Sequence, residues 1–134
     1  MLHTTMLARE ITDIIKKCTP EVNLENIHFC SGDMHSPEGI YVYSENDLYY
    51  YRVVEKGHIE QEYQCKKVQE VLWYVLENVL FETALKYTQE ICIAPENFRK
   101  TLLQQEAALF SRYGEPFYSR KREEIAKLLK QYPD

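Results

Sequence analysis

The amino-acid sequence predicts an α+β fold, with an N-terminal helix, a three- to four-stranded antiparallel β-meander and three C-terminal helices packed on one face of the sheet. Residues 39–64 predict the strands, because they are rich in β-branched and aromatic side chains and contain two short turn sequences. Residues 5–18 and 66–131 predict the helices, because their apolar side chains recur at helical spacing. The chain of 134 residues has the length of one domain, so we expect residues 1–134 to fold together.

The N-terminal helix is predicted over residues 5–18, where the apolar side chains of Leu7, Ile11, Ile14 and Ile15 recur at helical spacing. Lys16 and Lys17 lie at its C-terminal end, where positive charge interacts favourably with the helix dipole. Pro20 ends the helix, because the residue before a proline disfavours the helical conformation.

Residues 20–38 predict a loop, with a short strand at 27–29 as the fourth strand of the sheet. The loop gathers four side chains that can bind metal ions, namely His28, Cys30, Asp33 and His35. Their spacing matches no common zinc pattern, and turn formation alone explains the glycine, aspartate and proline. We therefore expect no metal and no cofactor, and a small metal- or Cys/His-dependent enzyme that uses residues 28–35 is the alternative.

The meander consists of three predicted strands at 40–43, 48–54 and 59–64. A turn of two residues, Lys56-Gly57, would pair Val54 with Ile59 and Arg52 with Gln61.

The predicted register of the first hairpin decides which side chains face outward. With a three-residue loop at 45–47, the more apolar face, which includes Val54, Ile59 and Tyr63, meets the helices. The opposite face then carries tyrosines and carboxylates toward solvent. A two-residue turn at Asn46-Asp47 would instead reverse the faces of the first strand, because a one-residue slip moves every side chain to the other face.

Three helices are predicted after the sheet. Residues 68–91 are apolar on nearly every side, which is typical of a buried central helix. The next helix starts at Pro95 and ends at Gly114, and the last runs from Pro116 to a point before Pro133.

Glu106 falls on the apolar stripe of its predicted helix. A carboxylate there is costly unless it is paired, so we expect a salt-bridged core residue with Arg52 or a C-terminal arginine as its partner. A functional acid with a perturbed pKa is the alternative.

The charge of the chain is concentrated in its first half. Residues 1–65 contain five basic and eleven acidic residues, a net charge of −6, whereas the whole chain has −5. This acidity argues against binding to nucleic acid or to an anionic membrane and favours a partner with a basic surface. The simpler interpretation is that the charge maintains solubility.

We expect a cytoplasmic protein with free thiols. The four cysteines are widely spaced and form no Cys-x-x-Cys pair. The N-terminus lacks the pattern of a signal peptide, and no apolar segment is long enough to cross a membrane.

The outward face of the meander is the predicted partner-binding site. Tyrosine offers rigid contact area with a polar tip, and carboxylates steer a basic partner toward the surface. Ordinary cross-strand packing is the alternative interpretation of the tyrosines. The predicted site residues are Tyr41, Tyr43, Tyr49, Tyr51, Glu45, Asp47, Glu60 and Glu62. No catalytic residue is predicted.

Residues 50–131 resemble the immunity protein 63 family of bacterial polymorphic toxin systems. The resemblance lies in the turn Val54-Glu55-Lys56-Gly57, the helix opening Glu70–Leu76 with Phe81, Ala84 and Tyr87, the segments Phe98-Arg99-Lys100 and Leu109-Phe110, and residues 123–133. The sequence departs from the family pattern at Lys56, in the order of Trp73-Tyr74 and at Glu106.

The resemblance implies a cytoplasmic, non-catalytic protein that binds and neutralises a cognate toxin domain. The expected toxin has a basic surface where it meets residues 38–62. A self-associating adaptor protein, acting as a homodimer, is the remaining alternative.

Overall fold

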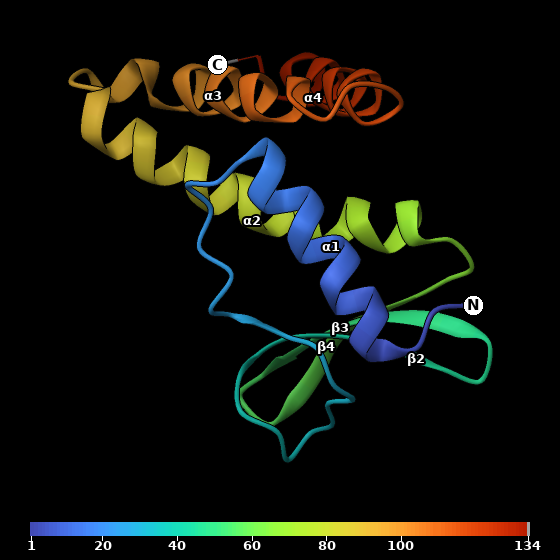
Figure 1. The fold of residues 1–134 in the computed structure, drawn as a ribbon. Helices are drawn as coiled ribbons and strands as arrows, with labels where there is room; N and C mark the ends of the chain where they lie inside the picture. The colour runs from blue at the N-terminus through green and yellow to red at the C-terminus, as the bar shows by residue number, and fades with distance from the viewer. Residues whose placement is uncertain (134) are drawn as a thin grey trace. The chain divides into compact units, whose positions relative to one another are not determined.

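A computed structural model describes residues 1–133 of the chain, which divides into two compact units, Met1–Glu77 and Asn78–Asp134. The predicted α+β class, with an N-terminal helix, four strands and three C-terminal helices, is confirmed (Figure 1). The elements in chain order are α1 (Thr4–Cys18), β1 (Ile27–His28), β2 (Gly39–Glu45), β3 (Leu48–Glu55), β4 (His58–Cys65), α2 (Val68–Ile91), the short 3₁₀ helix η1 (Pro95–Asn97), α3 (Phe98–Ser111) and α4 (Phe117–Gln131).

Helix α1 is the predicted amphipathic helix, and it buries Leu7, Ile11 and Ile15 completely. Its first residue is tied to the sheet, because the backbone N–H of Ser44 donates a hydrogen bond of 3.0 Å to the Thr4 hydroxyl. At its other end the hydroxyl of Thr19 donates to the carbonyl of Ile15. The hydrogen bond at Thr4 therefore joins the start of α1 to strand β2, and the bond at Thr19 closes the last turn of the helix.

The sheet has the strand order β1-β2-β3-β4. Strands β2, β3 and β4 form the predicted antiparallel meander, but β1 runs parallel to β2, with Ile27 opposite Ile40. The sheet is therefore mixed, and the prediction that it is antiparallel throughout is wrong for β1. The reason is the loop 29–38, which carries the chain back to the starting end of β1 before β2 begins.

Two tight turns fix the register of the meander. The β2–β3 turn consists of Asn46 and Asp47, both with positive φ of 52° and 61°, so Glu45 pairs with Leu48. The expected three-residue loop is wrong here, because Asn and Asp tolerate the left-handed conformation that a two-residue hairpin requires. The β3–β4 turn at Lys56-Gly57 is confirmed, with φ of 50° and 75°.

A β-bulge in β4 changes the register a second time. Val54 pairs with Ile59 as predicted, but Val53 pairs with Gln61, so Glu60 is the extra residue. Beyond the bulge Arg52 lies opposite Glu62, and the predicted pairing of Arg52 with Gln61 is wrong. A bulge moves each later side chain of the strand to the opposite face from the one that simple alternation assigns.

One face of the sheet packs against the first half of α2. The ring of Tyr51 lies 6.1 Å from that of Tyr63 and 5.7 Å from that of Tyr74 on α2. Tyr63 and Tyr74 are stacked, with ring centroids 4.0 Å apart. This face of the meander therefore meets the helix through aromatic rings.

The other face of the sheet forms a second small core of Tyr41, Tyr43 and Val54. The loop 29–38 covers part of it. The Tyr41 hydroxyl donates a 2.7 Å hydrogen bond to the carbonyl of Pro37, and a Cβ at Gly32 would lie 2.3 Å from the Tyr41 ring. Only glycine at position 32 lets the loop approach the ring so closely.

The unit Asn78–Asp134 contains the second half of α2 and the pair α3 and α4. Its core includes Leu109, Phe110 and Phe117, all buried. Lys121 on α4 is 2% exposed, and its ammonium lies 3.6 Å from the Glu106 carboxylate and 2.8 Å from that of Glu124.

Glu106 is thus a salt-bridged core residue, as expected, and Lys121 is an ionic partner that the sequence analysis did not name. The predicted pairing with Arg52 is wrong, because Arg52 binds Glu62. A second link joins these helices, because the Arg99 guanidinium of α3 donates to the carbonyls of Leu128 and Tyr132 at the end of α4. No helix within residues 1–133 is both long and apolar enough to cross a bilayer.

Candidate partner-binding surface

The four tyrosines predicted to face solvent are buried. Tyr41 and Tyr43 are each 3% exposed, Tyr49 is 4% exposed and Tyr51 is 5% exposed. The prediction that they form an outward surface is wrong. The two-residue turn places Tyr41 and Tyr43 on the face that the loop 29–38 covers, and Tyr49 and Tyr51 lie on the opposite face, where Tyr51 meets Tyr74 of α2. Their contacts are therefore part of the core.

Tyr49 and Tyr51 lie on the helix side of the sheet. The backbone N–H of Leu2 donates a 2.9 Å hydrogen bond to the Tyr49 hydroxyl, which ties the N-terminus to β3. Burial raises the pKa of Tyr51, and the negative charge of Glu77 raises it further. The Tyr51 phenol therefore stays neutral throughout the physiological range.

Tyr43 lies on the opposite face. Its ring stacks on Tyr50 with centroids 4.9 Å apart, and the Arg52 guanidinium lies 5.5 Å from its centroid. Burial raises the pKa of Tyr43, while the positive charge of Arg52 opposes the shift. Tyr43 thus anchors Arg52 by a cation–π contact.

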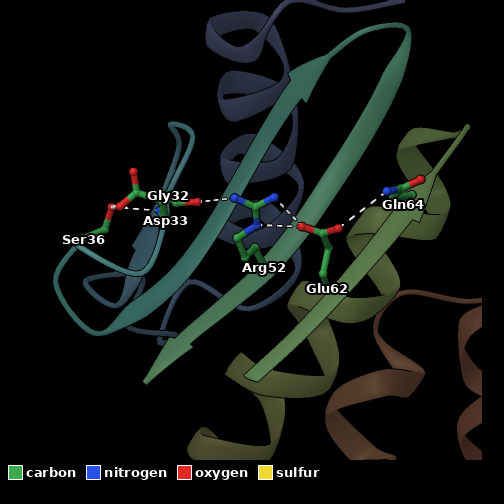
Figure 2. Close-up of polar contacts among 6 residues, drawn as sticks. All are labelled: Gly32, Asp33, Ser36, Arg52, Glu62 and Gln64. Atoms are coloured by element: carbon green, nitrogen blue, oxygen red, sulfur yellow. Dashed lines mark hydrogen bonds and ion pairs between the residues drawn. The ribbon is translucent and has the colours of Figure 1, made fainter. Parts of the chain in front are cut away.

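Arg52 joins the loop 29–38 to strand β4 (Figure 2). Its Nε donates a 2.7 Å hydrogen bond to Glu62 Oε1, Nη2 contacts the same oxygen, and Nη1 donates to the carbonyl of Gly32. Sequence reasoning missed this role of Arg52, because the pair with Glu62 exists only in the register that the bulge creates.

The loop itself is held by short-range hydrogen bonds. The backbone N–H of Asp33 donates to the Ser36 hydroxyl at 3.0 Å (Figure 2). The N–H of His35 donates to the Asp33 carboxylate at 2.8 Å. The Glu38 carboxylate accepts a 2.8 Å bond from the N–H of Lys56 in the β3–β4 turn. The loop is therefore fastened to the sheet at Gly32, Pro37 and Glu38.

Two of the four candidate metal ligands of this loop have other partners. His28 stacks on the ring of Tyr41 at 4.8 Å, and Asp33 caps its own turn. Across residues 1–133, no three His, Cys, Asp or Glu side chains come together as a metal site requires.

The cysteines are not paired in disulfides. Cys30 is exposed, whereas burial raises the pKa of the Cys65 thiol to about 11, with the Glu70 charge adding to the shift.

The four predicted carboxylates, Glu45, Asp47, Glu60 and Glu62, lie in exposed positions. They form two groups rather than one patch. Glu45 and Asp47 belong to the β2–β3 turn, level with Leu48, whereas Glu62 lies level with Arg52. Four residues of an extended strand separate these levels by about 13 Å.

Strand β4 is the most exposed part of the sheet. Every residue from His58 to Gln64 is exposed, and Cys65 alone is buried. Ile59 is 41% exposed and Tyr63 is 37% exposed. Sequence reasoning placed Tyr63 in the core, which is wrong, because one side of its ring stacks on Tyr74 and the rest faces solvent.

We define the acidic edge as strand β4 with its two carboxylates, Glu60 and Glu62, and the exposed ring of Tyr63. It combines negative charge, an aromatic surface and an unpaired strand edge, which are three properties that a protein partner can use.

The comparison with protein families identifies the chain. Residues 45–127, more than half of its length, match the family described as Immunity protein 63. The chain belongs to this family. The resemblance noted over residues 50–131 is thereby confirmed, and no curated protein and no solved structure matches the chain.

The Immunity protein 63 match starts at the last residue of β2 and runs into α4. It therefore includes the whole acidic edge and the Glu106–Lys121 pair, while α1, β1 and the loop 29–38 lie before it.

Proposed function

We propose that this chain is an immunity protein that binds a cognate toxin domain in the cytoplasm and neutralises it by occlusion, without catalysis of its own. The observation that carries the proposal is the Immunity protein 63 match over residues 45–127.

The distribution of charge supports a toxin with a basic surface. Residues 1–65 have a net charge of −6, and the exposed strand β4 contains neither lysine nor arginine and has two glutamates, of which Glu62 is ion-paired with Arg52 of β3. A negative surface of this kind accelerates encounter with a basic partner. Toxins that act on nucleic acid have such surfaces, because they must bind phosphates.

The contacts of residues 28–35 support a structural role for that loop. Gly32 packs on Tyr41 and receives Arg52, and His28 stacks on Tyr41. These contacts use the loop to cover the second core of the sheet.

The proposal is tested by co-expression. The toxin to test is the product of the neighbouring open reading frame, which we expect to encode a large secreted toxin, and its toxic domain is expressed from an inducible promoter in a bacterial host. We expect induction to arrest growth with an empty vector and this chain to restore growth.

Two controls make the result decisive. An unrelated immunity protein should give no protection, and the protected culture should contain toxin and this chain in one complex on gel filtration. Persistent growth arrest in cells that contain folded, soluble chain would contradict the proposal.

A further inference from the structure

Strand β4 ends the sheet, so within residues 1–133 one of its two edges has no strand beside it. Its side chains from His58 to Gln64 are exposed, which shows that solvent reaches this edge along most of the strand. An edge strand presents unpaired N–H and C=O groups that can pair with another chain.

The register identifies which backbone groups of β4 point outward. In a two-residue hairpin the residues that flank the turn exchange both hydrogen bonds, and bonded pairs then alternate with non-bonded pairs. Glu45 and Leu48 flank the β2–β3 turn and form the first bonded pair. Every second pair between β2 and β3 is then bonded, which includes Tyr43 with Tyr50 and Tyr41 with Arg52.

Tyr50 and Arg52 thus direct their backbone groups toward β2. Their neighbours on β4 are Gln64 and Glu62, which sit opposite them in non-bonded pairs. The N–H and C=O of Glu62 and Gln64 therefore point to the free edge, whereas those of Tyr63 point to β3.

The edge has only some of the features that prevent strands from pairing. Natural sheets protect their edges with charged side chains, above all lysine, and with proline, short strands or bulges, and of these β4 has two glutamates and one bulge. Strand β4 has eight residues and contains neither lysine nor proline. Its bulge, at Glu60, lies before the outward groups of Glu62 and Gln64.

The side chains along the edge define the chemistry of its occupant. Glu62 and Gln64 lie on one face of the sheet, and Tyr63 lies on the other, where its ring continues the aromatic stack with Tyr74. An added strand would place its own side chains beside these. A second copy of the chain would bring Glu60 and Glu62 of both molecules into one interface, which like-charge repulsion disfavours.

We infer that an extended segment of the toxin domain, with Lys or Arg on one face and apolar side chains on the other, adds to β4 as a fifth strand. The inference rests on the proposed function and specifies how the partner binds: main-chain hydrogen bonds at Glu62 and Gln64, basic side chains toward Glu60, since Arg52 already pairs with Glu62, and an apolar side chain on Tyr63.

The first test uses a proline on the edge. In Gln64→Pro the outward N–H is removed, while the bonds of β4 to β3 remain, since a proline is tolerated where its N–H would face solvent. The matched control is Gln64→Ala, which removes the same side chain but retains the N–H. Against the purified toxin domain encoded beside this chain, we expect Gln64→Pro to raise Kd about tenfold and Gln64→Ala to change it less than threefold.

The second test needs no substitution. Hydrogen exchange at the amides of Glu62 and Gln64 should be fast in the free chain and protected in the complex, whereas the Tyr63 amide should be protected in both. This measurement decides the question even where Gln64→Pro lowers the stability of the fold.

The outcomes separate this inference from the proposed function. Failure of the wild-type chain to bind the toxin domain removes both. Tight wild-type binding with unchanged exchange at Glu62 and Gln64, or with equal Kd for Gln64→Pro and Gln64→Ala, overturns only the strand addition. Dimerisation of the free chain that Gln64→Pro abolishes would also overturn it, because a second copy would then occupy the edge.

Discussion

Tyr51 and Tyr63 lie directly opposite each other on neighbouring strands, yet they have different surroundings. Tyr51 is 5% exposed, and Tyr63 is 37% exposed. Both rings contact Tyr74, but Tyr63 belongs to the edge strand, so solvent reaches the side of its ring that no further strand covers. The same residue type therefore serves the core at one position and the surface at the other.

This difference predicts different costs of substitution. Tyr51→Ala should lower the free energy of unfolding by about 3–5 kcal/mol, because it leaves a cavity in the core. Tyr63→Ala should lower it by about 1 kcal/mol, because much of its ring is already in water. Urea denaturation of the two variants measures both values, and equal losses would show that Tyr51 and Tyr63 are buried alike.

Single residues also show what could be predicted from the sequence. The exposure of Glu45, Asp47 and Glu60 followed from the cost of burying a carboxylate, which does not depend on the strand register. The exposure of the tyrosines did depend on it. A tyrosine is compatible with either face, so one residue more or less in a turn reverses its placement.

The elements differ in how well their sequences specify them. Helix α2 was predicted over its observed bounds, because its apolar pattern extends without interruption from Val68 to Ile91. The bulge at Glu60 and the parallel pairing of β1 have no such local pattern. They result from contacts between distant segments, such as Arg52 with both Gly32 and Glu62.

Helices α3 and α4 are joined by a buried ion pair, which predicts a non-additive response to mutation. Lys121→Met should lower the free energy of unfolding by about 3–5 kcal/mol, because it removes the ammonium beside the buried Glu106 carboxylate. Combining it with Glu106→Gln removes both charges and should recover part of that loss.

Thermal unfolding of the wild type, both single variants and the double variant measures this coupling. If the free energy of unfolding of the double variant falls by the sum of the two single decreases, Glu106 and Lys121 contribute independently.

At the scale of the whole molecule, the main property is the uneven distribution of charge. The net charge of −6 over residues 1–65 lies in the unit that contains the sheet, and the remaining residues are almost balanced. Composition alone revealed this asymmetry, whereas the structure was needed to show that part of it lies on an open strand edge. Binding that depends on such charge should weaken with ionic strength.

The most direct test of this account is the affinity of the purified toxin domain for wild-type chain, Glu60→Lys and Glu123→Lys, measured by calorimetry at low and high salt. Both substitutions exchange an exposed glutamate for lysine. Glu123, however, belongs to α4 and is not part of the acidic edge. We predict that Glu60→Lys raises Kd about tenfold at low salt and reduces the salt dependence, while Glu123→Lys binds like the wild type. Equal affinity of Glu60→Lys and the wild type at low salt would contradict the claim that the acidic edge binds the toxin.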